Sequence, residues 1–448
     1  MIRGTKSTAR TEKSTVEKSW QGNPRYIGLD VHKRVTEACL VNADGKVIAR
    51  ERLATTREYL QSFAKHVLQP GDHVALEATT NSWAVTRILQ PQVASVTVSN
   101  PLATKAIAQA KVKTDKVDAT VLAQLLRCDY LPGVWIPDES TQQMRELTSR
   151  RSALVGQRTA LRNRIHAVLA MRLIEAPERL FSKGGIEWLR VVEIDGQGRF
   201  LMESDLRQME LIDEELAKLD QMLAERGWQD DRVKLLMTLP GVDLAVAASL
   251  LAALGNIERF SDGDRAASYI GLVPSTRQSA KHCYHGPITK AGRSHTRSMM
   301  VQAAQHVGTH PGPLGHFFRK LAKKKNRNIA VVATARKLVK IAYLMLKTNQ
   351  PYRYAIPKST ETKLARLRVR ATGQRRKGGC GKGIKPTAKL PGGSRTIKSL
   401  AELYRLEGLP ELKVIPAGEA RTIEASKCQT FVRKLSTSQL VARGKKTD

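Results

Sequence analysis

The 448-residue sequence lacks several features that mark particular classes of protein. Its 5 cysteines are scattered without a Cys-x-x-Cys pair, which argues against a disulfide framework and a zinc site and suits a reducing cytoplasm. No apolar run approaches the roughly 18 residues of a membrane span. The polar segment 1–24, which we expect to be a flexible arm, contains no hydrophobic signal core. The Gly-x-x-x-x-Gly-Lys-Ser/Thr pattern of a phosphate-binding loop is also absent.

Acidic residues are comparatively few, with 41 Asp and Glu against 75 Lys and Arg, so the formal net charge is +34. A chain of this charge repels itself, and an anionic partner such as nucleic acid is its natural counterpart. Residues 353–448 alone hold 23 of the basic and 7 of the acidic residues. The Gly-rich basic stretch at 366–395 predicts a disordered tail that clamps phosphates or, alternatively, only aids solubility.

The pattern of apolar residues at 25–135 predicts an α/β domain. Asn42-Ala43-Asp44-Gly45 is a strong hairpin signal between two alternating stretches. Helical patterns follow, and the last of them covers 113–128. Three strands first, then strands alternating with helices, favour a mixed sheet with flanking helices. The strands are expected at 25–32, on both sides of the turn within 36–53, at 73–79 and at 94–100.

Four acidic residues fall where such a sheet would bring them together. Asp30 follows one strand and Glu77 ends another. Asp115 and Asp118 are three residues apart, so they share one face of a helix. Clustered carboxylates repel one another and are tolerated with cations, and oxygen ligands of this kind suit Mg²⁺ or Mn²⁺. Each acid alone would more often be a surface carboxylate or a helix cap, but their order in a very basic chain favours a metal site.

The motifs that hold these acids, YIGLDVHK, ALEAT and KTDKVDA, resemble the N-terminal domain of the DEDD transposases of the insertion-sequence 110/1111 group. The resemblance implies that 25–135 is a RuvC-like domain with an RNase H-type fold. It also implies a catalytic, metal-binding tetrad, which carries over to Asp30, Glu77, Asp115 and Asp118.

Heptad spacing at 140–228 predicts a coiled-coil hairpin. A second seam runs from Met209 to Leu223, and the segment 182–188 breaks the pattern between the two helices. The hairpin is either a spacer or a dimerisation element, and the resemblance favours dimerisation because the family pairs its subunits through such a segment. The first seam comprises Leu147, Leu154, Leu161 and Val168. A basic face of the first helix, which could bind nucleic acid, comprises Arg145, Arg150, Arg151, Arg158, Arg162 and Arg164.

A second functional region, mainly α-helical, is expected at 230–350. Residues 233–256 place a Pro-Gly turn between two apolar stretches, which is typical of a helix-hairpin-helix whose amides can hold a DNA phosphate. Residues 267–307 contain GLVP, a serine, ITK-x-G and an arginine, and they resemble the C-terminal transposase domain of the same family. The basic, amphipathic segment 314–346 suits a grip on a nucleic-acid backbone. The expected nucleic-acid contacts are Lys290, Arg293, Arg297, Arg319 and Lys320.

The resemblance implies a serine nucleophile between GLVP and ITK. Ser279 occupies the matching position, nine residues before Ile288, and Ser275 is the alternative because the family often has Ser-Ser-Gly where this chain has Gln278-Ser279-Ala280. A serine hydroxyl needs activation, which carboxylate-bound metals can supply. Attack would give a phosphoserine link to DNA and a free hydroxyl end. Three histidines nearby fit no metal motif and are interpreted as phosphate or loop contacts: His282, His285 and His295.

These features favour a cytoplasmic, nucleoid-associated DNA recombinase that mobilises an insertion sequence. It would act on donor and target DNA as a homo-oligomer, a dimer or a tetramer, with no membrane partner. The resemblance further implies a structured guide RNA, whose base pairing reads sequence while protein holds shape. One alternative is a metal-dependent junction-resolving nuclease, in which water attacks and no serine link forms. Another is a non-catalytic packaging protein, which has no use for a cluster of four acids.

Overall fold

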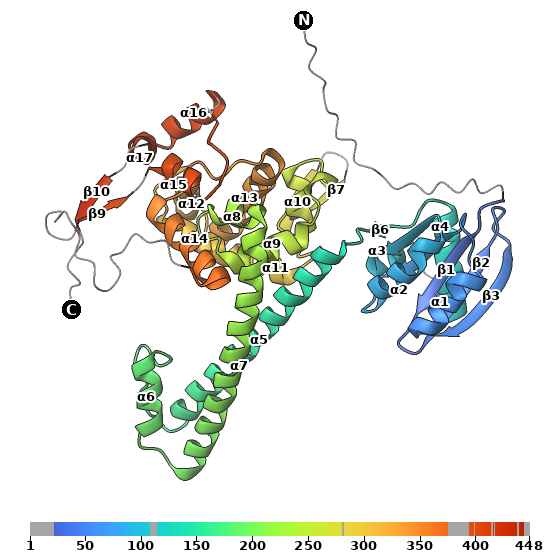
Figure 1. Cartoon of the computed structure of the whole chain (residues 1–448), viewed down its shortest axis with the longest axis horizontal. Coiled ribbons are helices and arrows are strands. Elements are labelled where there is room, and N and C mark those ends of the chain that lie inside the picture. Colours follow the sequence, from blue (N-terminus) through green and yellow to red (C-terminus); the bar gives the residue numbers. More distant parts are fainter. Residues whose placement is uncertain are drawn as a thin grey trace, which may run out of the picture. The chain divides into compact units, whose positions relative to one another are not determined.

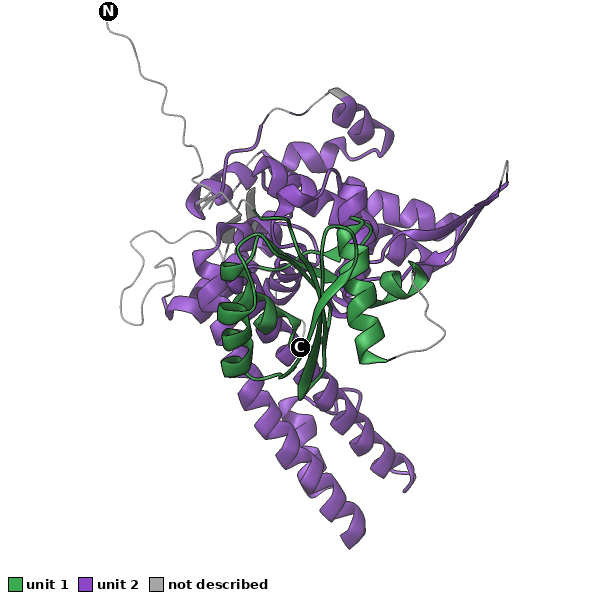
Figure 2. Ribbon diagram, turned by 90° about the vertical axis from the view of Figure 1, so that its right-hand side faces the viewer, with its two compact units in different colours: residues 1–137 green, residues 138–448 purple. Residues whose placement is uncertain are grey.

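The computed structural model describes residues 22–107, 114–279, 282–374, 394–397, 399–413, 415, 417–436 and 439–442. The chain divides into unit 1, residues 1–137, and unit 2, residues 138–448, which Figure 2 shows in different colours. The expected arm at 1–24 lies almost wholly outside the described residues. Among the residues that are described, no helix is long and apolar enough to cross a membrane.

Unit 1 is a mixed six-stranded sheet with flanking helices, as the sequence predicts (Figure 1). Its strands are β1 Tyr26–Val31, β2 Val35–Val41, β3 Val47–Ala54, β4 His73–Glu77, β5 Ser95–Ser99 and β6 Gly133–Val134. Its helices are α1 Arg57–His66, α2 Ser82–Leu89, the 3-10 turn Gln90–Gln92, α3 Pro101–Ile107 and α4 Asp115–Arg127. The strand order is β3-β2-β1-β4-β5-β6. The strands β1, β4 and β5 are parallel, and the others pair antiparallel.

The hairpin expected around residues 42–45 is confirmed and joins β2 to β3. The Gly45 amide donates to the Asn42 carbonyl, and the Asn42 side chain accepts from the amides of Asp44 and Lys46. Gly45 has a φ of +83°, a conformation that glycine adopts without steric cost. Local turn chemistry therefore determines where the chain reverses.

Successive residues of β1 point to opposite faces of the sheet. Ile27 and Leu29 are fully buried in the core that the sheet forms with α1 and α2. On the other face, Gly28 lies against α4, where a Cβ atom on Gly28 would stand 1.9 Å from the carbonyl oxygen of Ala119. The absence of a side chain lets α4 approach β1 closely. This approach brings the start of α4 to the end of the strand that carries Asp30.

Unit 2 is mainly helical. Its first helices are α5 Glu139–Ala170, α6 Lys183–Val191, α7 Gly196–Gln229, α8 Asp231–Met237, α9 Leu244–Leu254, α10 Gly263–Tyr269, α11 Ser294–Gln305, α12 Pro313–Lys324 and α13 Arg327–Thr348. The others are α14 Pro357–Thr372, α15 Leu400–Leu406, α16 Ala417–Ala425 and α17 Gln429–Leu435, with 3-10 turns at Ile257–Arg259 and His306–Thr309. β7 Pro274–Ser279 and β8 His282–Ile288 form an antiparallel hairpin. β9 Ser394–Ile397 pairs antiparallel with β10 Gln439–Ala442, and α15, α16 and α17 lie between them in the chain.

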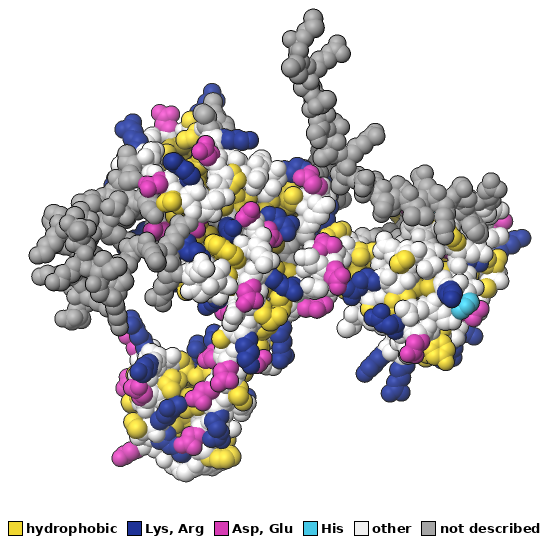
Figure 3. Space-filling view, in the orientation of Figure 1, with side chains coloured by type: hydrophobic (Ala, Val, Ile, Leu, Met, Phe, Trp, Pro, Cys, Tyr) yellow, Lys and Arg dark blue, Asp and Glu magenta, His cyan; other side chains and the backbone are white. Residues whose placement is uncertain are grey.

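The heptad segment forms an antiparallel pair of long helices, α5 and α7 (Figure 1). The seam residues Leu161 and Met209 are buried. The segment that breaks the heptad pattern forms α6, and its Leu189 is buried in the same cluster at the far end of the pair. Basic and acidic side chains alternate over this lobe in Figure 3.

The basic face of α5 is used mainly within the protein, contrary to its expected role in binding nucleic acid. Arg151, Arg158 and Arg164 pair with Asp220, Asp213 and Asp205 of α7, each at 2.6 Å. Arg145 is buried and donates to the carbonyl of Ala252, and the Arg162 guanidinium lies 4.8 Å from the centre of the Phe181 ring. Partly exposed ion pairs add little stability each, but their positions suit only one register of the two helices.

The tail expected to be disordered at 353–448 is folded over most of its described part. The α14 helix buries Leu364 and Leu367 in the core of unit 2, and α15 buries Leu403 and Tyr404 there. Leu364 and Leu367 are three residues apart, and Leu403 and Tyr404 are adjacent, so the buried side chains of each helix lie on one apolar face. The basic composition obscured this pattern. The most Gly-rich part, 375–393, lies outside the described residues.

The substitution Gly28→Ala tests the close approach of α4 to β1. The added methyl group would overlap the Ala119 carbonyl, and overpacking of this kind costs about 1–3 kcal/mol. We therefore expect a lower melting temperature, measured by calorimetry. Gly156→Ala on α5 is the matched control, because nothing lies within 4 Å of its Cβ position. This control should be neutral or stabilising by up to about 1 kcal/mol, and equal melting temperatures for both variants would contradict the packing argument.

Candidate functional site

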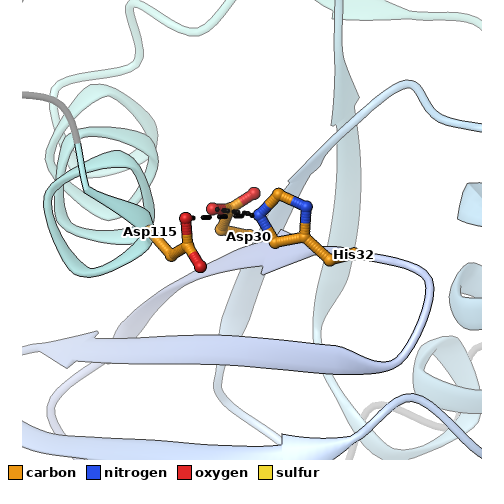
Figure 4. Close-up of side chains that lie close together, drawn as sticks. All are labelled: Asp30, His32 and Asp115. Carbon is orange, nitrogen blue, oxygen red and sulfur yellow. Dashed lines mark hydrogen bonds and ion pairs between the residues drawn. The ribbon is translucent and has the colours of Figure 1, made fainter.

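Three side chains converge at the carboxyl end of β1 (Figure 4). Asp30 lies in β1, His32 follows the strand, and Asp115 is the first residue of α4. The Nε2 atom of His32 is 3.1 Å from a carboxylate oxygen of Asp30 and 3.4 Å from one of Asp115. One potential ligand atom from each residue lies within 4.8 Å of the other two. The start of α4 is fixed by Thr114, whose hydroxyl accepts from the Val117 amide.

Burial raises the pKa of the Asp30 carboxyl above its ordinary value. The nearby Asp115 and Asp118 carboxylates add to this rise, while His32 opposes it. The pKa of His32 is raised in turn, chiefly by the charge of Asp30. The site therefore concentrates negative charge on a residue that is poorly solvated. A positive group next to Asp30 relieves that cost.

The structure brings Asp30, Asp115 and Asp118 into electrostatic contact. Glu77 ends β4, the parallel neighbour of β1, and Leu76 is in register with Leu29. Because residues in register point to the same face of a parallel sheet, Glu77 is placed beside Asp30 on the face covered by α4.

The sequence motifs do not predict two further residues of this site. His32 belongs to the YIGLDVHK motif, but nothing in the motif marks it as a neighbour of the acids. Glu37 lies opposite Asp30 in the β1–β2 ladder, is only 6% exposed, and stands 3.2 Å from the Arg52 guanidinium. One feature of the sequence points to burial of Glu37. It alternates with Cys39 and Val41, so it lies on the same face of its strand as these two buried apolar residues.

The donor set fits a divalent ion. The two carboxylates and the imidazole offer oxygen and nitrogen atoms at separations that one ion can bridge. The Asp30 side chain is only 17% exposed, so the repulsion among the acids is weakly screened by water. Asp30, Asp115 and His32 offer ligand atoms close enough together to share one ion. Carboxylate oxygens suit Mg²⁺ or Mn²⁺.

The candidate serines lie on the β7–β8 hairpin of unit 2. Ser279 ends β7 and is exposed, whereas Ser275 is half-buried at the base of the hairpin. The Ser275 hydroxyl oxygen stands 2.6 Å from where a Cβ atom of Gly286 would be. The hairpin is followed by the ITK-x-G segment, in which Lys290 and Gly292 have φ angles of +54° and +72°. Ser279 is the more accessible of the two hydroxyls.

The five basic residues expected to contact nucleic acid have different surroundings. Arg297 donates to the carbonyls of Ile270, Lys290 and Ala291, and Arg319 donates to those of Gly308 and His310. These two guanidinium groups therefore hold loops in place. Arg293 is half-buried, and burial lowers its pKa, with the Arg145 charge adding to the effect. Lys290 and Lys320 are exposed and can contact a phosphate.

The Pro-Gly turn between α8 and α9 is held by the protein's own charged groups. The Asp243 carboxylate accepts from the Val246 amide at the start of α9. Lys363 of α14 is partly buried and donates to the carbonyls of Leu239 and Val242. Burial lowers the pKa of Lys363 to about 8. An acid already caps this helix start, so we interpret the turn as a structural element rather than the phosphate site expected from the sequence.

Two parts of the chain match families of transposases. A model described as a transposase, of the DEDD type in the IS110 group, matches residues 27–172. A second, described as transposase of the IS116/IS110/IS902 family, matches residues 233–318. Together the two ranges span more than half of the chain. The chain belongs to the IS110 group of insertion-sequence transposases.

Several relatives are similar over most of their length. A putative transposase of Sinorhizobium fredii is 29% identical, over 73% of this chain and 86% of its own. The transposase for insertion sequence element IS1111A of Coxiella burnetii is 24% identical, over 73% and 91%. A pilin gene-inverting protein of Moraxella bovis is 24% identical, over 73% and 97%. Each aligned region covers 73% of this chain, which is more than either unit alone contains.

The substitution Asp30→Asn should stabilise the protein without a divalent ion and abolish its stabilisation by one. The pKa of Asp30 in the folded protein lies above its ordinary value of 3.8. Its charged form therefore costs stability as the pH rises through and beyond that range, and an amide removes the cost. Melting curves at pH 7 with and without Mn²⁺ measure both effects. An ion at a hundred times its Kd should stabilise the parent by about 2.7 kcal/mol.

The control is Asp129→Asn, which changes an exposed aspartate of unit 1 and should behave like the parent. A Mn²⁺-dependent rise in melting temperature that survives Asp30→Asn would exclude Asp30 as a ligand.

Proposed function

We propose that this transposase cleaves and rejoins DNA through a phosphoserine intermediate formed on Ser279. The observation that carries the proposal is the exposure of Ser279 at the end of β7, within the range that matches the second transposase model. The pilin gene-inverting relative supports DNA recombination as the outcome. Cleavage by water, as in a junction-resolving nuclease, is the alternative.

In the proposed reaction the Ser279 oxygen attacks a DNA phosphorus atom. One P–O bond to the serine forms as the P–O bond to deoxyribose breaks, which leaves a free hydroxyl end. The energy of the phosphodiester is kept for rejoining, so no external nucleotide is needed. A divalent ion, Mg²⁺ or Mn²⁺, would supply polarisation of the phosphate when bound at the carboxylates of Asp30, Glu77, Asp115 and Asp118.

We assign unit 1 to the RuvC-like, RNase H-type class. The assignment is supported by its mixed sheet, in which β1 and β4 are parallel neighbours and carry Asp30 and Glu77 at their carboxyl ends. It is also supported by α4, which presents Asp115 and Asp118 in its first turn on the same face of the sheet.

The proposed partners are donor DNA, target DNA and a structured guide RNA. The net charge of +34 and exposed lysines such as Lys290 and Lys320 favour contacts with phosphates. Aromatic residues, at 5% of the chain, offer few stacking platforms for reading bases. Such a balance is consistent with a protein that holds nucleic acid by its backbone while base pairing selects the sequence.

A homo-oligomer is proposed to form through the far end of the α5–α7 pair. Large apolar side chains are exposed there, including Leu173 at 95%, Met171 at 82% and Phe200 at 66%. Met171 and Phe200 line one hollow together with Val168 and Leu201. Clustered exposed apolar residues are typical of a protein–protein contact.

Ser279→Ala should abolish the covalent protein–DNA adduct and strand exchange, because the attacking oxygen is removed. The assay incubates the protein with nicked donor and target DNA and looks for a shifted band on denaturing gels. Protein with its co-purified RNA is compared with ribonuclease-treated protein, which should lose strand exchange if a guide is needed. Binding of Mn²⁺ should persist in the variant.

Ser275→Ala is the control and should retain the adduct. If only Ser275→Ala loses it, the nucleophile moves by four residues. If the parent cleaves DNA and neither substitution matters, water is the nucleophile and the resolving-nuclease function holds.

Phe200→Gln combined with Leu173→Gln should lower the oligomeric state, since a polar side chain in an apolar contact must lose its hydration. Light scattering of the purified protein measures the mass. Leu344→Gln is the control, because Leu344 is also exposed but lies on α13. An unchanged mass for the double variant would place the contact elsewhere.

A further inference from the structure

The two faces of the β7–β8 hairpin carry different residues. In its ladder Ser279 is opposite His282 and Arg277 is opposite Tyr284, so these four side chains share one face. Thr276 and His285 are opposite each other on the other face. Their contact is direct: Nδ1 of His285 is 3.0 Å from the Thr276 hydroxyl, and Nε2 is 3.8 Å from the Cys283 sulfur. The two histidines thus have separate surroundings.

The face of Ser279, His282, Arg277 and Tyr284 is accessible. All four residues are exposed, and Tyr284 is 68% exposed. Directly opposite residues of antiparallel strands have Cβ atoms about 4.5–5.5 Å apart. An imidazole reaches a serine hydroxyl across that separation by simple side-chain rotation. The intervening residues 280 and 281 lie outside the described part of the chain.

The chemistry of this face matches the needs of serine attack on a phosphodiester. A hydroxyl is a weak nucleophile until a base takes its proton, and histidine is the side chain best suited to do so near neutral pH. Arg277 lies two residues before Ser279 on the same face of β7, and its planar guanidinium can donate two parallel hydrogen bonds to phosphate oxygens. Tyr284 offers an exposed ring against which a nucleobase can stack.

We propose that His282 is the general base for Ser279, with Arg277 holding the attacked phosphate. This inference rests on the proposed function of Ser279. The Ser279 proton passes to an imidazole nitrogen of His282 as the oxygen–phosphorus bond forms. The electron pair of the breaking bond stays on the deoxyribose oxygen, which takes a proton from water. The imidazolium returns its proton to the hydroxide left behind, and the reverse transfers occur on rejoining.

The test measures the initial rate of adduct formation by the full-length protein on a nicked suicide DNA substrate between pH 5 and 8. His282→Gln should lower the rate at pH 7.5 at least about 100-fold, since general bases contribute 10²–10⁴-fold. The parent rate should fall as the pH is lowered towards 5, because a protonated imidazole cannot accept the serine proton, and the variant should lack this dependence. The other titratable groups are Arg277 and Tyr284 on this face and Cys283 and His285 on the other.

His285→Gln is the matched control, because it removes the same ring from the opposite face of the same strand. This variant should keep the parent pH profile and a rate within about threefold of the parent rate. That result would show that the general base lies on the face of Ser279 and not on the opposite face. Added imidazole should restore adduct formation to His282→Ala, whereas a structural defect would not respond to it. DNA binding by all variants should match the parent.

Other outcomes separate this inference from the function on which it rests. If Ser279→Ala still forms the adduct, or the parent forms none, the serine mechanism itself fails and the inference fails with it. If Ser279→Ala loses the adduct while His282→Gln keeps the parent rate and pH profile, the serine stands and His282 is not its base. Equal losses in His282→Gln and His285→Gln, without rescue by imidazole, would likewise overturn the inference, since they indicate a role in folding of the hairpin.

Discussion

The contact between α4 and the bare backbone of Gly28 is the constraint on which unit 1 depends. The backbone of α4 occupies the space that a side chain at position 28 would need. The start of α4 therefore lies close to the carboxyl end of β1. Asp115 and Asp118 in the first turn of α4 are thereby brought near Asp30 of β1. Burial raises the pKa of Asp30, and the Asp115 and Asp118 carboxylates that this closeness brings near add repulsion to that rise. Packing of the other face of β1, around Ile27, supplies the stability that this repulsion opposes.

Positive charge is divided between two uses in this chain. Arg151, Arg158 and Arg164 neutralise acids of α7 and so fix the register of the long helices. Arg297 and Arg319 bind backbone carbonyls. Arginine suits such roles because its planar fork makes several directed hydrogen bonds. Exposed lysines, in contrast, follow one another at 323–325, at the end of α12. A count of basic residues therefore overestimates the surface available to phosphates.

The parts of the fold that sequence could predict are those with local causes. The turn at 42–45 follows from its own side chains, and the heptads of α5 and α7 require only a seam on each helix. The position of Asp30 beside Asp115 follows from strand order and motif. In contrast, the partners of the α5 arginines and the docking of α14 through Leu364 depend on residues distant in sequence. Composition was misleading for the tail because two short apolar faces flank a long basic stretch.

In the proposed reaction, the hairpin of Ser279 and the acids of unit 1 would serve different steps. Carboxylates around a cation act on the charge of a phosphate, but they do not by themselves place a base beside the serine. A two-stranded ladder does so directly, since the residue opposite Ser279 is fixed by register. One face of β7–β8 thus offers a hydroxyl, an imidazole and a guanidinium within two ladder positions, while its other face ties His285 to Thr276. In the proposed reaction this short hairpin would therefore carry both the nucleophile and its proton acceptor, whatever the distance in sequence to Asp30.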